Sequence, residues 1–364
     1  MKVAMVGGFL NIRGGGERFI LETTKGFLKR GLKVRVFCHR YNSNEGYEGF
    51  QRVPIESMDA RTDIFGRFRA YYGLKNIREL VLRADRWGAD VIFLQIGYIF
   101  SRYLQRLTKK RIVSYVHFQE RFEARNESGL RDFYRRTLKL SDSEVLGVEK
   151  VPIICNSHHT EQIIRRRFPD AENVFVVYPG ADLDRFRPTW NDLGYLYYHS
   201  RYGGSKNQKL AVEIASQIKY PIVLAGFLDR KLYGDYYDEL VAHKPSNVTM
   251  LNNVSDDKLL SYLQNCSIFL YPSLNEHFGM ATVEAMACGK PVIGHNSGAT
   301  PEVLSGCGFL CGDDVREWIE KINCLMADRK LRQELGAKSH ETAKRYSWDH
   351  TVAELERIFH SALR

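Results

Sequence analysis

The sequence lacks the features that mark several common protein classes. Its 364 residues contain no uninterrupted run of about 20 apolar residues, the length that a membrane-spanning helix needs. The opening stretch MKVAMVGGFLNIRGGGERF has no hydrophobic core of the signal-peptide type, so we expect a cytoplasmic protein. A composition of 44% hydrophobic and 26% charged residues, without low-complexity segments, excludes a disordered or fibrous chain.

Cysteine is scarce and its pattern does not suggest pairing. The seven cysteines are odd in number, scattered and mostly within apolar runs, which argues against a disulfide framework. Cys307 and Cys311 are close in sequence but have no second pair of ligands nearby. We therefore expect no metal at these two residues.

Positive charge is concentrated in the first half of the chain. The net charge is +10, with 34 Lys/Arg against 23 Asp/Glu in residues 1–200 and 19 against 20 in residues 201–364. Such asymmetry indicates a surface that meets lipid headgroups, a phosphorylated acceptor or nucleic acid. Basic and aromatic residues interleave in 61–78 and 98–111, a pattern typical of a helix on anionic lipid. A core-facing helix with a cationic outer side remains the alternative, and a nucleic-acid-binding protein is a more remote one, because no recognised module accompanies the pattern.

Length and hydrophobic periodicity predict two doubly wound α/β domains. An apolar run ending in glycine, the loop Gly14-Gly15-Gly16 and a helical pattern from Glu17 to about Lys29 form the start of a βαβ unit. After Pro188 the same rhythm begins again. Strands are predicted at 32–39, 89–96, 111–118, 151–157 and 173–180, then at 195–201, 220–226, 248–253, 267–273 and 290–296. Because apolar strands alternate with helices, the sheets should be parallel.

The most informative stretch is 271–304, YPSLNEHFGMATVEAMACGKPVIGHNSGATPEVL. Glu276 follows a predicted strand, Phe278-Gly279-Met280 opens a helix, and Glu284 lies on that helix. Free backbone N–H groups at a helix start suit a phosphate, and the two carboxylates can accept hydrogen bonds from a sugar and a ribose. The alternative is that one carboxylate interacts with the helix dipole and the other is a solvated helix residue.

Three further positions are candidates for binding or catalysis. In SRYGGSKN, Arg201 ends a predicted strand and Lys206 lies five residues on at a predicted helix start, so both cations could meet a diphosphate; otherwise they are surface charges. His117 closes a strand at the carboxyl edge of the first sheet, where ligands of open α/β folds bind. A histidine in that position is otherwise a satisfied polar residue.

Two motifs suggest other chemistries. Asp182-Leu-Asp184 imitates a metal-binding DxD motif, but its turn context favours a capping role for aspartate. The loop Gly14-Gly15-Gly16 could begin a dinucleotide fingerprint, yet the third glycine position holds Phe19 and the expected acid is replaced by Cys38-His39-Arg40. Because Arg40 could accept a 2′-phosphate, NADP is not excluded at this point.

The block 271–304 resembles a known family. Its pattern PSxxExFGxxxxEAMAxGxPVI, with seven residues between Glu276 and Glu284, is similar to that of retaining nucleotide-sugar glycosyltransferases of family 4. The form NEHFGMATVEAMACGKPVIGHNSG is most similar to the α-mannosyltransferases that extend lipid-linked oligosaccharides from GDP-mannose. The resemblance extends to GGGER, YVH, IICNS, YPGADLDRFRP, SRYGGSKN and YSWDHTVAEL, and thus spans nearly the whole chain.

The resemblance implies a GT-B fold of two Rossmann-like domains that face each other across a cleft. It implies an acceptor-binding domain over 1–185, a nucleotide-sugar-binding domain over 186–346 and a C-terminal helix, 347–364, that crosses back onto the first. Roles are implied at these positions: catalysis by His117, Glu276, Arg201 and Lys206, donor binding by Arg201, Lys206, Glu276, Phe278, Gly279, Met280 and Glu284, and acceptor or phosphate contact by Gly14, Gly15 and Gly16.

The resemblance also implies the reaction. A hexose, most simply mannose from GDP-mannose, would be transferred with retention to a glycan or lipid-linked acceptor, and a UDP-sugar donor is the alternative. No metal or other cofactor is expected, because Arg201, Lys206 and a helix dipole would take the cation's role. A protein with such an acceptor is expected in the cytoplasm, with peripheral contact to an anionic membrane. No nucleic-acid partner is expected.

Overall fold

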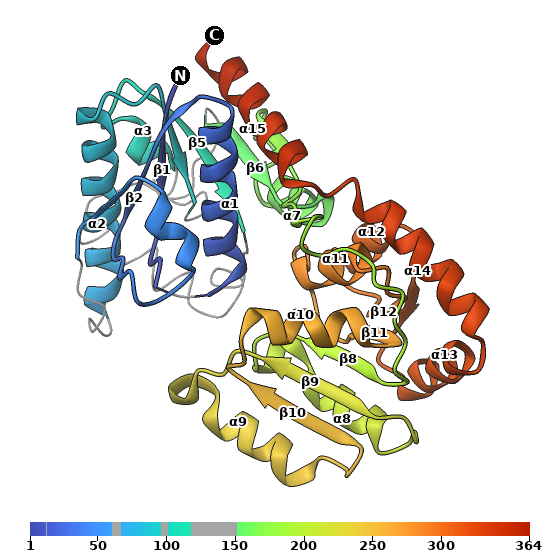
Figure 1. The fold of residues 1–364 in the computed structure, drawn as a ribbon. Helices are drawn as coiled ribbons and strands as arrows, with labels where there is room; N and C mark the ends of the chain where they lie inside the picture. The colour runs from blue at the N-terminus through green and yellow to red at the C-terminus, as the bar shows by residue number, and fades with distance from the viewer. Residues whose placement is uncertain (12, 60–66, 96–100, 118–150) are drawn as a thin grey trace. The chain divides into compact units, whose positions relative to one another are not determined.

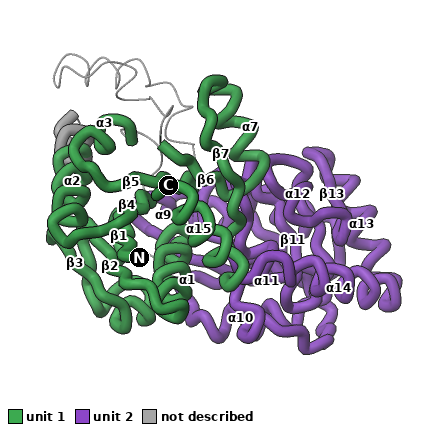
Figure 2. Tube along the Cα trace, turned by 90° about the horizontal axis from the view of Figure 1, so that it is seen from above, with its two compact units in different colours: residues 1–179, 348–364 green, residues 180–347 purple. Residues whose placement is uncertain are grey.

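The computed structural model describes residues 1–11, 13–59, 67–95, 101–117 and 151–364 (Figure 1). The chain divides into two compact units. The first comprises residues 1–179 and 348–364, and the second comprises residues 180–347 (Figure 2). The sequence-based boundaries were residues 185 and 346, and the structure divides the chain at 179 and 347.

The first unit is built on a parallel sheet. Its strand order is β3-β2-β1-β4-β5-β6-β7, which places the first strand of the chain at an inner position, as in doubly wound folds. The strands are β1 (Lys2–Val6), β2 (Lys33–Cys38), β3 (Ile55–Ser57), β4 (Val91–Leu94), β5 (Arg111–Val116), β6 (Ile153–Cys155) and β7 (Val174–Val176). All were predicted from the sequence except the edge strand β3, whose sequence IES lies in no apolar run.

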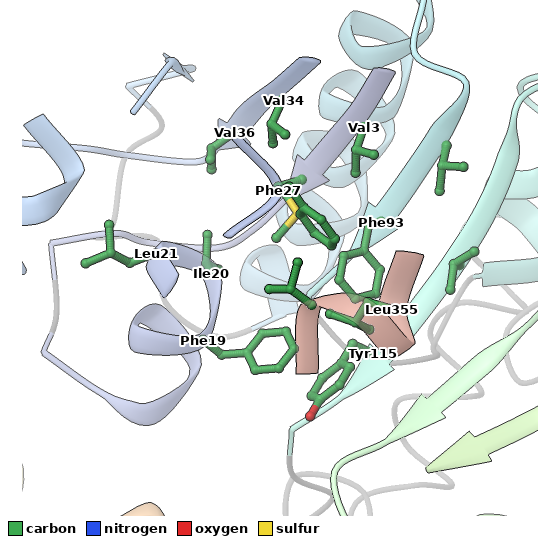
Figure 3. Close-up of a cluster of buried hydrophobic side chains, with 14 of the residues drawn as sticks. Val3, Phe19, Ile20, Leu21, Phe27, Val34, Val36, Phe93, Tyr115 and Leu355 are labelled. Atoms are coloured by element: carbon green, nitrogen blue, oxygen red, sulfur yellow. The ribbon is translucent and has the colours of Figure 1, made fainter. Parts of the chain in front are cut away.

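Helices cover both faces of this sheet. On one face, α2 (Arg67–Arg86), α3 (Ser101–Gln105) and α7 (His158–Arg167) contribute to one buried apolar cluster. On the other, α1 (Gly15–Lys29) and α15 (Trp348–Leu363) contribute to a second cluster. Figure 3 shows this second cluster, where Phe19 and Leu355 meet Phe93 and Tyr115 of the sheet. A short 3₁₀ helix, η1 (Glu48–Arg52), precedes β3.

The last helix belongs to the first unit although it follows the whole second unit in sequence. The ring of Phe359 lies 4.9 Å from that of Phe93 and 5.6 Å from that of Phe27. Arg30 forms an ion pair with Glu356 at 2.6 Å on the rim of the same contact. Burial of the apolar side of α15 against α1 and the sheet thus ties the end of the chain to its beginning.

The second unit repeats the architecture. Its parallel sheet has the order β10-β9-β8-β11-β12-β13. The strands are β8 (Leu196–His199), β9 (Ile222–Gly226), β10 (Val248–Asn252), β11 (Ile268–Tyr271), β12 (Val292–His295) and β13 (Phe309–Cys311). The helices are η2 (Gly204–Lys206), α8 (Gln208–Ala215), α9 (Arg230–His243), α10 (Asp256–Asn265), α11 (Met280–Ala287), α12 (Thr300–Leu304), α13 (Val315–Ala327) and α14 (Arg329–Ala343). The predicted α/β class with two Rossmann-like domains is confirmed, and of the strands of this unit only β13 was not predicted.

The basic and aromatic segment 98–111 lies partly within the described residues. From Ser101 onward, Leu104 is fully buried, and Tyr103 and Leu107 pack against the same core cluster. The apolar side of this segment therefore faces the protein interior, as in the core-facing alternative. Residues 61–66 and 98–100 lie outside the described part of the chain. Within that part, no helix combines the length and apolar character that crossing a membrane requires.

The contact between α1 and α15 depends on the absence of a side chain at Gly26. A Cβ at this position would overlap Cγ2 of Val352, a side chain with little rotamer freedom. Gly26→Ala should therefore lower the free energy of unfolding by about 1 to 3 kcal/mol, although alanine favours a helix by about 1 kcal/mol over glycine. Adding Val352→Ala should recover part of that loss in urea denaturation.

Gly234→Ala is the matched control, because Gly234 also lies in a helix, α9, and its added Cβ would meet only Arg230 at an ordinary 3.8 Å. This variant should be neutral or stabilising. Equal effects of the two alanine substitutions would contradict the close packing of α1 on α15.

Candidate active site

The loops that follow two neighbouring strands of the second sheet meet at its carboxyl edge. β8 and β11 are paired in parallel, so the segments after His199 and after Tyr271 leave the sheet side by side. The backbone N–H of Leu274 donates to the carbonyl of Ser205 at 3.0 Å. Lys206 and Glu276, 70 residues apart in sequence, are thereby brought together.

Glu276 is a nearly buried carboxylate with three donors on one oxygen. Its Oε2 accepts hydrogen bonds from Nζ of Lys206 at 2.6 Å, from the hydroxyl of Tyr271 at 2.8 Å and from Oγ of Ser273 at 3.0 Å. The side chains of Glu276 and Lys206 are only 16% and 20% exposed. None of the described residues donates to Oε1.

The ionised form of Glu276 is strongly favoured. Burial by itself raises the pKa of this carboxyl, but the charge of Lys206 and the hydrogen bonds from Lys206, Tyr271 and Ser273 outweigh burial and lower the pKa to about 2. Its partners are thus a cation and two hydroxyls rather than a helix dipole. The alternative in which Glu276 merely precedes a helix does not account for this arrangement.

The backbone around Glu276 is fixed by a second loop. The carbonyl of Glu276 accepts from the N–H of Ala299 at 2.7 Å, and Oγ of Ser297 accepts from the N–H of Asn275 at 3.0 Å. Gly298 has φ +61° and lies so close that a Cβ there would be 2.7 Å from the carbonyl carbon of Asn275. The stretch NSG at 296–298 therefore serves as a support for the carboxylate loop.

Tyr271, Ser273, Ser297 and Gly298 are site residues that the sequence interpretation did not assign. They lie in the quoted stretches YPS and NSG. Their positions within the motif were visible, but nothing in a linear pattern shows that a tyrosine and a serine share one oxygen of Glu276.

Helix α11 begins directly after this loop, as predicted. Gly279, with φ +85°, is its N-cap and provides no side-chain cap, so the first backbone N–H groups of α11 have no such partner. Phe278 is 3% exposed and Met280 opens the helix. Glu284 lies on α11, half-buried, one turn beyond Met280.

Arg201 and Lys206 differ in their surroundings. Lys206 is already paired with Glu276, whereas Arg201 is exposed and forms an ion pair with none of the described residues. Arg201 lies two residues beyond β8, and its carbonyl accepts from Nε2 of Gln208 at 2.8 Å. Its backbone is therefore anchored while its guanidinium is available to a ligand.

Asp182 and Asp184 do not form a paired carboxylate site. Oδ1 of Asp182 accepts from the N–H of Arg185 at 3.0 Å and its carbonyl accepts from the N–H of Phe186 at 2.8 Å, so Asp182 caps a turn. Asp184 is exposed. In the described residues, no three His, Cys, Asp or Glu side chains are grouped as ligands for a metal ion.

The carboxyl edge of the first sheet holds His117. Its Nε2 lies 2.9 Å from Oε1 of Gln95, and its ring packs 5.0 Å from that of Phe19 and 4.7 Å from that of Tyr115. Burial lowers the pKa of His117 to about 3, so the imidazole is neutral at physiological pH. A neutral imidazole can accept one hydrogen bond and donate another.

The glycine loop lies beside this histidine. Helix α1 begins at Gly15, two residues earlier than predicted, and Gly14 is its N-cap without a side-chain cap. A Cβ at Gly16 would lie 3.9 Å from Cδ2 of His117. Gly16 and His117 are thus brought together. Phe19 stacks on Tyr115 in the core at 4.1 Å, so a large ring fills the place where a dinucleotide fingerprint needs its third glycine.

Comparisons with known proteins agree with this architecture. Residues 13–185 match the family described as Glycosyltransferase Family 4, and residues 182–342 match the family described as Glycosyl transferases group 1. The chain is 25% identical over 370 residues to Alpha-1,3/1,6-mannosyltransferase ALG2 of Homo sapiens, covering 91% of this chain and 89% of that protein. It is 24% identical over 382 residues to the protein of the same name from Rhizomucor pusillus, covering 89% and 83%.

A solved structure shows the same fold. Anabaena HepE in complex with UDP and glucose superposes with a TM-score of 0.76 at 18% identity, covering 99% of this chain and all 100% of that one. Together the two family matches span residues 13–342, from the glycine loop to the end of the second sheet's helices. The chain is therefore a glycosyltransferase with the GT-B fold, in which a family 4 domain is followed by a group 1 domain.

Proposed function

We propose that this glycosyltransferase transfers mannose from GDP-mannose, with retention of the α configuration, to a glycan or lipid-linked acceptor. The observation that carries the proposal is the ionised, nearly buried Glu276 beside Lys206, within a motif similar to that of α-mannosyltransferases. Two relatives that match over most of the chain are named as mannosyltransferases, which supports mannose as the transferred sugar.

In this proposal the second unit binds the donor. Oε1 of Glu276 accepts a hydrogen bond from a sugar hydroxyl, a charge-assisted contact to a carboxylate that is only 16% exposed. Arg201 and the N–H groups at the start of α11 meet the diphosphate, and Lys206 adds positive charge next to it. Glu284 binds a ribose hydroxyl, and Phe278, Gly279 and Met280 shape the helix start. No metal ion is required, because these groups supply the positive potential.

The transfer itself replaces one bond with another on the same face of the sugar. The bond from the anomeric carbon to the diphosphate oxygen breaks, and a bond from that carbon to the acceptor oxygen forms. The acceptor's proton passes to the leaving phosphate oxygen. Stabilisation of the charge that develops on the diphosphate is the main contribution of the protein.

The first unit binds the acceptor in this proposal. Gly14, Gly15 and Gly16 present backbone N–H groups at the start of α1, and His117 lies next to them. Because burial lowers the pKa of His117 to about 3, its imidazole is too weak a base to take a proton from a hydroxyl efficiently. Its role in this proposal is therefore to orient a hydroxyl, from a ring held between Phe19 and Tyr115.

The location and the membrane contact belong to the same proposal. We infer a cytoplasmic enzyme that meets anionic lipid through cations alone, since the apolar residues of 101–107 are used in the core. Exposed Arg106, Lys109 and Arg111 support such a contact. A UDP-sugar donor is the second candidate, supported by the UDP bound to HepE in a fold of the same kind.

A panel of donors tests the proposed reaction. GDP-mannose, GDP-glucose, UDP-glucose and UDP-galactose are compared for binding and for release of the nucleoside diphosphate, with EDTA and with added magnesium. GDP-mannose should be the best donor, EDTA should leave the rate within about twofold, and Glu276→Gln should lower kcat by about 100-fold at nearly constant nucleotide affinity. Preference for a UDP-sugar would overturn the donor assignment, and dependence on magnesium would reinstate Asp182 and Asp184 as ligands.

The depressed pKa of Glu276 makes a second prediction, about stability. The folded pKa of about 2 lies below the unfolded value of about 4.3, so the ionised carboxylate contributes stability above pH 4.3 that is lost as the pH falls toward 2. By pH 3 the lost contribution is about 2 kcal/mol. The difference in unfolding free energy between wild type and Glu276→Gln should therefore shrink by that amount between pH 7 and pH 3.

Urea denaturation followed by tryptophan fluorescence, to which Trp318 buried in the same unit contributes, measures this difference. Glu239→Gln is the matched control, because Glu239 pairs with Lys209 on the surface. Its difference from wild type should hardly change with pH. A pH-independent difference for Glu276→Gln would show that the carboxyl is not held ionised.

A further inference from the structure

Three buried polar atoms without partners belong to residues that follow neighbouring strands of the first sheet. Within the described part of the chain, Oδ1 of Asn11, Nε2 of His39 and Nε2 of Gln95 are buried and form no hydrogen bond. These residues follow β1, β2 and β4, which neighbour one another in the sheet. Because buried polar groups in folded proteins are almost always paired, a group of unpaired ones at the ligand-binding edge of an α/β sheet indicates a ligand that completes them.

Gln95 is the residue of this group that touches a candidate catalytic residue. It is 7% exposed and directly follows β4, and its backbone N–H donates to the carbonyl of Val6 at 2.8 Å. Its amide oxygen lies 2.9 Å from Nε2 of His117, the first residue after the neighbouring strand β5. The amide nitrogen on the same carbon is the unpaired atom.

The contact fixes the tautomer of His117. An amide oxygen only accepts hydrogen bonds, so Nε2 of His117 must carry the proton and Nδ1 must hold the lone pair. None of the described residues donates to Nδ1. Packing against Phe19 and Tyr115 fixes the ring plane, and Nδ2 of Asn156 donates to the His117 carbonyl at 2.8 Å.

The free groups at this edge match a polyol better than an anion. Nε2 of Gln95 is a donor, and Nδ1 of His117 and Oδ1 of Asn11 are acceptors. Nε2 of His39 can be either, because burial lowers the pKa of His39 to about 4 and the ring is neutral, so all four groups are uncharged. A phosphate has only acceptor oxygens near neutral pH and would face two lone pairs. A sugar hydroxyl both donates and accepts, so neighbouring hydroxyls of one ring can pair with the amide nitrogen of Gln95 and with Nδ1 of His117, two side chains that are joined by a 2.9 Å contact.

We propose that Gln95 is a positioning residue that holds His117 in its Nε2-protonated tautomer and donates its free amide N–H to a hydroxyl of the bound glycosyl ligand. Only the second part of this role, the contact with a hydroxyl, rests on the proposed function. The tautomer of His117 is a property of the free protein, whereas the hydroxyl contact requires a glycosyl substrate.

Three variants separate the two halves of the role. Gln95→Leu removes both the acceptor and the donor at similar size, and Gln95→Glu keeps an acceptor for His117 but loses the N–H donor. Gln51→Leu is the matched control, because Gln51 is exposed in the same unit and its side-chain amide donates to the carbonyl of Ser43. Circular dichroism and the melting temperature establish that each variant is folded.

The tautomer is measured by ¹⁵N NMR of histidine-labelled protein, with the His117 signals assigned by their loss in His117→Asn. Wild type, Gln51→Leu and Gln95→Glu should show a protonated Nε2 and an unprotonated Nδ1, and Gln95→Leu should show a mixture of tautomers. A protonated Nδ1 in wild type, or an unchanged tautomer in Gln95→Leu, would overturn the first half of the proposal. If Gln95→Leu does not fold, the tautomer of His117 in the wild type still tests the first half of the proposal.

Steady-state kinetics with the best donor and acceptor test the second half. Gln95→Leu and Gln95→Glu should each lower kcat/KM about tenfold, the size of one lost hydrogen bond, while Gln51→Leu stays at the wild-type value. Rates for Gln95→Glu equal to those of wild type would overturn the hydroxyl contact. If the wild type transfers no hexose from any donor, the proposed function and the hydroxyl contact both fail, but the tautomer result stands on its own.

Discussion

The ion pair between Lys206 and Glu276 is the interaction on which the second unit's site depends. A charged carboxylate with 16% exposure is costly unless it is paired and hydrogen-bonded, and here three donors meet one of its oxygens. The pair joins the loop after β8 to the loop after β11, so the position of each loop depends on the other. The N-terminus of α11 is fixed as a consequence, since it follows Glu276 directly.

In this arrangement all three donors bind Oε2 of Glu276, so Oε1 is left for a ligand. Replacing Lys206 would remove the counter-charge of a buried anion, so its loss should affect folding as well as catalysis. Arg201, which is exposed and anchored only through its backbone, is the cation whose replacement reports on ligand binding alone. The two cations of SRYGGSKN thus have different physical roles.

The first unit carries an uncharged counterpart of the same design. His117 and Gln95 follow neighbouring parallel strands, as Lys206 and Glu276 do in the second unit. Doubly wound sheets bring such residues together because the carboxyl ends of their parallel strands lie at one edge of the sheet. The carboxyl edge of the second sheet presents the charged pair of Lys206 and Glu276, and that of the first sheet presents the uncharged pair of His117 and Gln95.

Much of this could be predicted from the sequence, and the limits have physical causes. Apolar runs and glycines were sufficient to place most strands and α11, including the three-residue strands β6 and β7, which lie within the apolar runs VPIIC and VFVV. The strands β3 and β13 were missed because β3 (IES) lies in no apolar run and β13 (FLC) is a run of three residues between glycines. The motif identified Glu276, but its partners Tyr271 and Ser273 depend on side-chain geometry. Nothing in the sequence assigns a role to Gln95, because its unpaired amide nitrogen is evident only once the side chain is seen packed in the fold. The pattern of residues 98–111 favoured a helix whose apolar side lies on lipid. In the structure Leu104 of this segment is buried in the core of the first unit, which the pattern alone could not distinguish.

The most direct test of this account is a double-mutant cycle between Lys206 and Glu276. Hydrogen exchange of the α11 amides, residues 280–287, gives the local opening free energy of wild type, Lys206→Met, Glu276→Gln and the double variant. Each single substitution should cost about 3 kcal/mol, and the double variant should cost about 2 to 3 kcal/mol less than their sum, because the second substitution removes a charge already unpaired. Effects that add to within about 0.5 kcal/mol would contradict the claim that this ion pair organises the site.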